Sequence, residues 1–170
     1  MSNPEIFSKK VRIEIENITE FLNLINEKYA EEIQNIQENV AEEDEGIEWY
    51  ADEIHLLNSV SNLGRQLATV AFYRVIEFNF KKLYEKLWSE KEIKKLNLYR
   101  FKEAKKALRK RNIDLELIIH YEFINEIRKK NNDIKHEELN IIIEEKMLEG
   151  AEEKIIEFFR ILSKVIYKIK

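Results

Sequence analysis

Four residues have types and spacing suited to chemistry on a phosphate: Arg128, Asn132, Lys135 and His136, within the stretch INEIRKKNNDIKH. In a helix each four-residue step turns about 400°, so Arg128, Asn132 and His136 drift by only about 40° per step. They therefore share one stripe of a helix. An imidazole exchanges protons near neutral pH, and a guanidinium binds two phosphate oxygens at once. The pattern predicts proton transfer at a phosphate.

Such a set of residues can support RNA cleavage without a metal. RNA breaks when its own 2′-hydroxyl attacks the adjacent phosphate, which requires a proton carrier and a cation that steadies the phosphate. In this interpretation His136 is the general acid or base and Arg128 is the phosphate clamp. Lys135 adds positive charge beside the scissile phosphate, and Asn132 hydrogen-bonds His136 or a substrate oxygen.

The same four residues also have structural interpretations, which the sequence leaves open. Arg128 can be an ordinary cation near the C-terminus of a helix, where it favours the helix dipole, and Lys135 can be a solvated charge. Asn132 can cap the end of a helix, because asparagine tolerates the left-handed conformation. His136 can be an inert surface side chain. The choice between these roles and catalysis depends on what surrounds each side chain.

The order Arg-x3-Asn-x2-Lys-His, placed behind an amphipathic helix in a helical chain, resembles HEPN domains over about residues 55–170. These domains are small helical bundles whose signature is an Arg, a short polar spacer and a His. The family's spacer is about four to six residues, whereas seven residues lie between Arg128 and His136. Many HEPN proteins are ribonucleases of toxin and defence systems. The resemblance implies a metal-independent endoribonuclease that acts on RNA.

The resemblance also implies partners. In the family the site usually forms near a groove between two subunits, which implies a homodimer here and a duplicated site. An antitoxin or a nucleotidyltransferase partner follows by the same analogy. The alternative is a non-catalytic HEPN-like module that binds a nucleotide or another protein. In that case the same residues hold a phosphate or shape a subunit interface.

Composition and length favour helices packed around one core. The chain has 170 residues, with three Gly, one Pro, 44% hydrophobic residues and 36% charged residues. Because few residues break helices, and a chain of this length can bury one core, we expect a single all-α domain. The expected architecture is a HEPN-like bundle of about four to six helices with an antiparallel up-and-down core. Its parts are a long N-terminal helix with an acidic loop, residues 1–46, and a core bundle, residues 47–170.

Some classes of site are excluded. The chain has no cysteine, which removes disulfides and thiolate metal sites. In His136-Glu137-Glu138-Leu139-Asn140 an asparagine stands where a HExxH zinc motif needs its second histidine, so we expect no metal and no cofactor. There is no run of about 18 apolar residues, and the N-terminus lacks the apolar segment of a signal peptide. We therefore expect a cytoplasmic protein without a membrane partner.

Charge is distributed unevenly along the chain. Ten acidic residues and no Lys or Arg lie between Lys28 and Arg65. Residues 91–111 carry ten basic and two acidic residues, a local charge of about +8. This basic cluster can attract the phosphates of RNA. Alternatively, the acidic and basic segments are solvated helix faces that partly neutralise each other.

Hydrophobic periodicity predicts two long helices. Apolar residues recur every three to five positions from residue 5 to about residue 40, which indicates one amphipathic helix. A second helix is expected from about residue 48 to residue 84 or beyond, with a break allowed between Asn58 and Gly64. Its centre is apolar on most faces, as expected of a helix around which others pack. We expect the buried residues to include Val70, Phe78, Leu83, Ile124, Phe159 and Leu162.

Shorter helices should follow. A basic helix is expected over residues 99–111, and Asp114 is a good N-cap for the next helix. That helix is expected to run unbroken into the motif and to carry on one stripe Leu117, Tyr121, Ile124 and Arg128. A final helix is expected from about Ala151, after a separation at Gly150. Packing of the apolar stripe would hold Arg128 in place.

Overall fold

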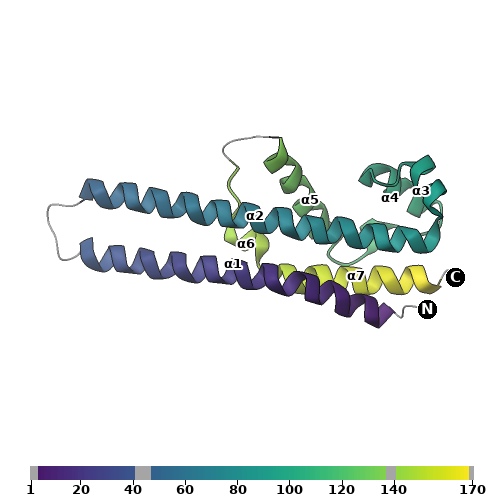
Figure 1. The fold of residues 1–170 in the computed structure, drawn as a ribbon, viewed down its shortest axis with the longest axis horizontal. Coiled ribbons are helices and arrows are strands. Elements are labelled where there is room, and N and C mark those ends of the chain that lie inside the picture. The colour runs from purple at the N-terminus through teal and green to yellow at the C-terminus, as the bar shows by residue number, and fades with distance from the viewer. Residues whose placement is uncertain (1–3, 41–46, 137–140, 169–170) are drawn as a thin grey trace.

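Helices make up the fold. The computed structural model describes residues 4–40, 47–136 and 141–168, which contain helices and turns but no strand. Two long helices, α1 (Pro4–Val40) and α2 (Ile47–Leu87), lie side by side and antiparallel (Figure 1). A third helix, α7 (Ala151–Lys168), packs along the N-terminal part of α1. The expected all-α bundle with a long N-terminal helix is confirmed.

Three shorter helices lie on the other side of α2 from α1 in the view of Figure 1, namely α3 (Glu90–Leu96), α4 (Phe101–Arg109) and α5 (Tyr121–Lys135). The remaining short elements are a 3-10 helix (Leu115–Leu117) and the single turn α6 (Glu145–Leu148). Of these, α5 makes the most extensive contact with α2. The motif helix is therefore braced directly on the central helix of the fold.

The aromatic core lies at the end of the molecule where α1 begins and α7 ends. The ring centroid of Phe80 on α2 lies 5.2 Å from that of Phe159 and 5.7 Å from that of Phe158, both on α7. The ring centroid of Phe7 on α1 lies 6.2 Å from that of Phe159. Ring pairs that are tilted or edge-to-face at such separations are favourable. The apolar stripe of α7 thus joins the two long helices.

Local capping sets several helix ends. The Ser89 side chain accepts a hydrogen bond from the Glu92 N–H, and the Glu92 carboxylate accepts one from the Ser89 N–H, a capping box that starts α3. Asn97, with a φ of 52°, ends α3 in the left-handed conformation. Gly150, with a φ of 64°, precedes α7. The predicted start of the final helix at Ala151 is confirmed.

α2 runs without interruption through Asn58–Gly64, where the sequence allowed a break. Gly64 is buried, and a Cβ at this position would lie 2.3 Å from Cδ1 of Ile25 on α1. The missing side chain therefore lets the two long helices approach closely. This packing outweighs the cost of a glycine in a helix interior, about 1 kcal/mol.

The helix expected to run from Leu115 into the motif is interrupted. The Asp114 carboxylate caps only a 3-10 turn, where it accepts a hydrogen bond from the Glu116 N–H at 3.1 Å. The backbone then passes through His120, whose φ of 65° is left-handed, and α5 begins at Tyr121. Leu117, expected on the apolar stripe, is 85% exposed. The prediction of one continuous helix is wrong because apolar periodicity does not reveal a change of direction between two apolar segments.

Burial agrees with the sequence at most of the expected positions. Four of the expected core residues are buried, namely Leu83, Ile124, Phe159 and Leu162. Val70 is half-buried. The prediction for Phe78 is wrong, since 50% of its surface is exposed. It lines an open groove, where the Nζ of Lys82 lies 3.8 Å from the centroid of its ring.

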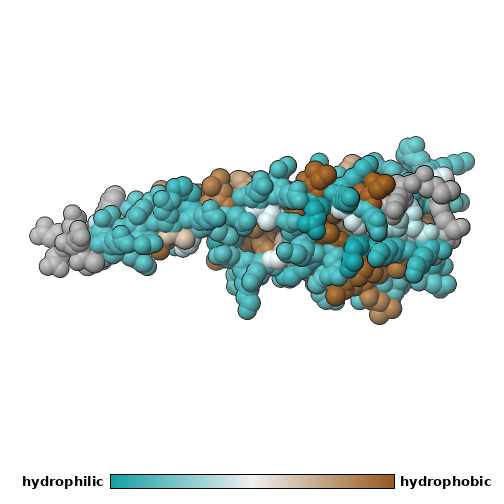
Figure 2. All heavy atoms as spheres, turned by 90° about the horizontal axis from the view of Figure 1, so that it is seen from below, coloured by the Kyte–Doolittle hydropathy of each residue, from teal (hydrophilic) through white to brown (hydrophobic). Residues whose placement is uncertain are grey.

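The face drawn in Figure 2 is largely hydrophilic. Figure 2 shows hydrophilic residues along the narrow end of the molecule and apolar residues gathered over its wider part. Within the described ranges, no helix combines the length and the apolar composition needed to cross a bilayer. The acidic loop expected at residues 41–46 lies outside the described residues.

Candidate functional site

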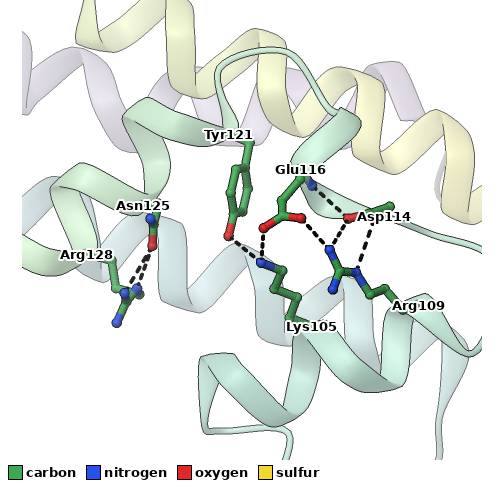
Figure 3. Close-up of polar contacts among 7 residues, drawn as sticks. All are labelled: Lys105, Arg109, Asp114, Glu116, Tyr121, Asn125 and Arg128. Atoms are coloured by element: carbon green, nitrogen blue, oxygen red, sulfur yellow. Dashed lines mark hydrogen bonds and ion pairs between the residues drawn. The ribbon is translucent and has the colours of Figure 1, made fainter.

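Arg128 lies in the middle of α5 and is held by two neighbours. Its Nε and Nη2 donate to Oδ1 of Asn125, about one turn earlier, at 3.2 and 3.0 Å (Figure 3). Its Cζ lies 5.1 Å from the ring centroid of Phe101, the first residue of α4, a cation–π distance. Among the described residues these bonds use Nε and Nη2, so Nη1 keeps its two donors for a ligand.

Lys135 lies on nearly the same face of α5 as Arg128, because seven residues are only 20° short of two full turns. Its Nζ lies 5.8 Å from the ring centroid of Tyr73 on α2. Burial raises the pKa of the Tyr73 hydroxyl above its ordinary value, Glu77 raises it further, and the positive charge of Arg128 opposes both. Two cations of the motif therefore act on one tyrosine of the central helix.

Asn132 and His136 continue the stripe that begins at Arg128. Asn132 is half-buried, and His136 is exposed at the residue after the end of α5. The His136 N–H donates to the carbonyl oxygen of Asn132 at 3.0 Å, so helical hydrogen bonding extends to this residue. The C-cap of α5 is His136 rather than Asn132. Residues 137–140, which follow, lie outside the described part of the chain.

Arg128 and His136 are well separated along their common stripe. Eight residues of α-helix rise about 12 Å. Arg128 also leans toward the N-terminus of α5, where it binds Asn125. In this conformation the two side chains reach different parts of a bound strand. To meet at one phosphate, Arg128 has to leave Asn125 and turn toward the end of α5, so the assignment of both to one catalytic centre stays a prediction.

A groove of about 640 Å³ opens beside Tyr73 and Phe101, between α2 and the segment that contains α3 and α4. Six aromatic side chains line it: Tyr73, Phe78, Phe80, Tyr84, Tyr99 and Phe101. Phe78 and Tyr99 are each at least half exposed, so their rings are open to a ligand. Arg128 lies over Phe101 and close to Tyr73, which places it at the rim of this groove.

Ion pairs fix the position of α4 relative to α5 (Figure 3). Lys105 pairs with Glu116, and Arg109 pairs with Glu116 and, at 3.2 Å, with Asp114. Lys105 also donates to the hydroxyl of Tyr121, the first residue of α5, at 3.2 Å. These contacts join α4 to the 3-10 turn and to α5. They also neutralise two cations of the basic cluster locally, so the cluster is less positive than its composition indicates.

Tyr73 and Phe101 are functional candidates that the sequence did not single out. They come from different helices, and neither belongs to a recognisable motif. A usable signal was the alternation of aromatic and basic residues in Tyr99-Arg100-Phe101-Lys102. Aromatic rings beside basic side chains are typical of surfaces that bind single-stranded nucleic acid.

The site offers cations, aromatic faces and one exposed imidazole to a ligand. In the part of the chain that the structure describes, no group of three or more His, Asp or Glu side chains is placed to hold a metal ion. Comparisons of the chain with protein-family models, with curated proteins and with solved structures each found no match. The chemistry of the groove and its charged rim is therefore the basis for assigning a function.

Proposed function

We propose that this chain is a HEPN-like RNA-binding protein that holds a single-stranded segment in the groove of Tyr73 and Phe101. Bases stack on the aromatic walls, and phosphates bind Arg128 and Lys135. The observation that carries the proposal is the position of Arg128, over one groove aromatic and close to another. Stacking on aromatic side chains contributes about 1–3 kcal/mol per base, and a guanidinium can bind two phosphate oxygens.

The size and charge of the groove support a ligand of this kind. A volume of about 640 Å³ lies within the range of sites for small ligands, about 300–1,000 Å³, and suits nucleotides better than a duplex. Bases in a single strand can be splayed out and stacked, whereas paired bases cannot. Among the residues that line the groove, Arg74 and Lys81 balance Glu14 and Glu77, and Arg128 and Lys135 add positive charge beside the rings of Phe101 and Tyr73.

Fluorescence anisotropy with a labelled single-stranded RNA tests the proposal. Arg128→Ala should weaken binding by about 10- to 150-fold, because a hydrogen bond to a charged group contributes about 1.5–3 kcal/mol. The slope of log affinity against log salt concentration should also become shallower by about 0.7, the value for one phosphate contact on a single strand. Lys129→Ala is the matched control, since it removes the same charge from the next, exposed residue.

The aromatic wall provides a second arm of the same experiment. Tyr99→Ala should weaken binding while leaving the salt dependence unchanged, because stacking releases no counterions. Leu117→Ala, at an exposed apolar residue away from the groove, is its control. If Arg128→Ala and Tyr99→Ala bind RNA as tightly as the two control variants, RNA does not occupy this groove.

Metal-independent RNA cleavage is the second candidate function. The observation that favours it is the exposed imidazole of His136 on the stripe that also carries Arg128 and Asn132. A strand that leaves the groove along α5 would reach His136 about 12 Å beyond Arg128. Lys135 would then add positive charge next to the reacting phosphate. A role in toxin or defence systems, with an antitoxin or nucleotidyltransferase partner, belongs to this candidate through the HEPN resemblance.

Incubation of the protein with mixed RNA in the presence of a chelator tests this second function. Cut ends should carry a 2′,3′-cyclic phosphate or its hydrolysis product, because the RNA's own hydroxyl is the attacking group. DNA lacks that hydroxyl and should survive. If the protein binds RNA as proposed but cleaves none, the function is that of a non-catalytic binding module.

A further inference from the structure

α2 carries an apolar stripe that faces solvent. The stripe, referred to below as the α2 seam, consists of Leu56, Val60, Leu63 and Leu67, which are 62%, 56%, 54% and 54% exposed. Their spacing of four, three and four residues keeps all four within about 60° of one another around the helix. Steps of three and four residues keep an apolar stripe on one side of a helix, where a second helix can pack along it.

Other contacts of this part of α2 occupy different faces. Asn58 accepts a hydrogen bond from the Tyr29 hydroxyl of α1 at 2.7 Å. Asn62 and Gln66 donate to the carbonyl oxygen of Ile141 at 2.9 and 2.7 Å. At 100° per residue, Asn58 lies on roughly the opposite side of α2 from the seam, and Asn62 and Gln66 lie about 90–130° away from it. Contiguous apolar residues exposed in this way mark a site of interaction.

Charge at the two ends of the seam indicates which partner fits. Asp52 and Glu53 flank its N-terminal end, and the exposed Arg74 lies in line with it, seven residues after Leu67. A second copy of α2 in parallel would place acid beside acid and Arg74 beside Arg74. An antiparallel copy places each acidic end beside the partner's Arg74. Such an arrangement is self-complementary, as a two-fold symmetric interface requires.

We propose that two copies of this chain pair through an antiparallel contact between their α2 seams. Leu56, Val60, Leu63 and Leu67 of both copies form the apolar centre of the interface. Asp52 and Glu53 of each copy lie near Arg74 of the other and set the antiparallel direction. The four apolar seam residues lie outside the groove, so the apolar contact does not depend on RNA binding, whereas Arg74 lines the groove and belongs to both proposals.

Sedimentation equilibrium tests the pairing. The wild type should be a dimer at tens of micromolar, and Leu63→Glu should weaken self-association by at least about ten-fold because it places a charge in the apolar centre. Ile13→Glu is the matched control: it changes an equally exposed apolar residue, 64% exposed, on α1 and should leave the dimer intact. Circular dichroism verifies that both variants remain folded. A monomeric wild type, or equal effects of the two substitutions, would overturn the proposal.

Direction is tested separately. Arg74→Glu alone should weaken the dimer, and Glu53→Arg combined with Arg74→Glu should restore it, because the exchanged charges face each other again. Since the chain has no cysteine, single cysteines can report proximity. A mixture of Glu53→Cys and Arg74→Cys chains should form mixed disulfides in preference to those of either chain alone. Efficient crosslinking of Glu53→Cys chains to one another would instead show a parallel pair. A wild type that does not self-associate but binds a different protein would show that the partner is not a second copy of this chain.

Discussion

Arg128 and His136 lie on the same stripe of α5 but in different surroundings. Arg128 is half-buried, bound to Asn125 and placed over Phe101. His136 is exposed at the end of the helix and takes part in helical bonding only through its backbone N–H. If RNA is cleaved, one residue contributes mainly to binding and the other mainly to proton transfer. Their substitutions should therefore affect different measured quantities.

For His136→Ala we expect loss of cleavage with little change in RNA affinity. Removal of one positioned proton-transfer group typically lowers the rate by about 10²- to 10⁴-fold. Arg128→Ala should lower both affinity and rate. Single-turnover cleavage of labelled RNA, measured beside anisotropy, separates the two effects. His55→Ala, at an exposed histidine on α2, is the control, and undiminished cleavage by a folded His136→Ala variant would remove His136 from the mechanism.

The common stripe of Arg128, Asn132 and His136 could be predicted because it depends only on helical periodicity. The neighbours of Arg128 could not be predicted. Phe101 belongs to α4, and its approach to α5 depends on the left-handed turn at His120. A chain path of this kind is decided by packing between helices, and no local pattern in the sequence encodes it.

At the scale of elements, the junction between α4 and α5 depends on charge. The hydrogen bond from the Glu116 N–H, together with Arg109, lowers the pKa of Asp114 below its ordinary 3.8. The hydrogen bond from Lys105, assisted by the charges of Lys105 and Arg109, lowers the pKa of Glu116 below its ordinary 4.5. Both carboxyl groups are thus favoured in their charged form by the folded state. Acid should loosen this junction.

The sign of the pH effect follows from these directions. A folded-state pKa below the unfolded value stabilises the fold above the unfolded pKa, and this contribution is lost as the pH falls through the folded pKa. The urea concentration at the midpoint of unfolding should therefore decrease as the pH is lowered from about 5 to about 3. Relative to the wild type, the double variant Asp114→Asn, Glu116→Gln should have a lower urea midpoint at pH 7. Its midpoint should also decrease less as the pH is lowered. Glu126→Gln, at an exposed residue of α5, serves as control, and identical profiles for the double variant and the wild type would contradict the prediction.

Helices with a long apolar periodicity could be predicted from the sequence. The 3-10 turn and the start of α5, where the chain changes direction, could not. α1 and α7 were expected close to their observed bounds. The residue Asp114 was correctly identified as a cap, but it caps a 3-10 turn. His120 has a left-handed backbone conformation, which is uncommon for a residue other than glycine. Its side-chain Nε2 lies 3.1 Å from the Glu157 carboxylate of α7, which ties this turn to the last helix. No local sequence pattern predicts this contact, because the two residues are 37 positions apart in the chain.

On the scale of the whole molecule, the long helices give an extended shape (Figure 1). The 41 residues of α2 span about 60 Å. Part of the α1–α2 hairpin extends beyond α7 and contains the α2 seam. The close approach at Gly64 and the Tyr29–Asn58 hydrogen bond hold the two helices together in this part. The hairpin therefore presents a long, thin surface rather than a compact one.

Small-angle scattering should detect this shape. A compact chain of this length has a radius of gyration of about 16 Å, and we expect a clearly larger value because α2 alone is about 60 Å long. The Leu63→Glu variant is the suitable sample, since it should remain monomeric. Its molar mass, measured by light scattering on the same sample, is the control. A monomer with a radius of gyration near 16 Å would show that the hairpin folds back on the core.

The contact between Phe7 and Phe159 also has a consequence in time. The two residues are about 150 positions apart, so the ribosome makes α1 early and α7 late. At about 5–20 residues per second, roughly 8 to 30 s separate the synthesis of Phe7 from that of Phe159. Once α2 has emerged, in the later part of this interval, the N-terminal part of α1 can pack against α2 but still lacks α7. A nascent chain that stalls before Ala151 thus leaves the N-terminal end of α1 open to chaperones or to neighbouring chains, and folding can finish only when α7 has emerged.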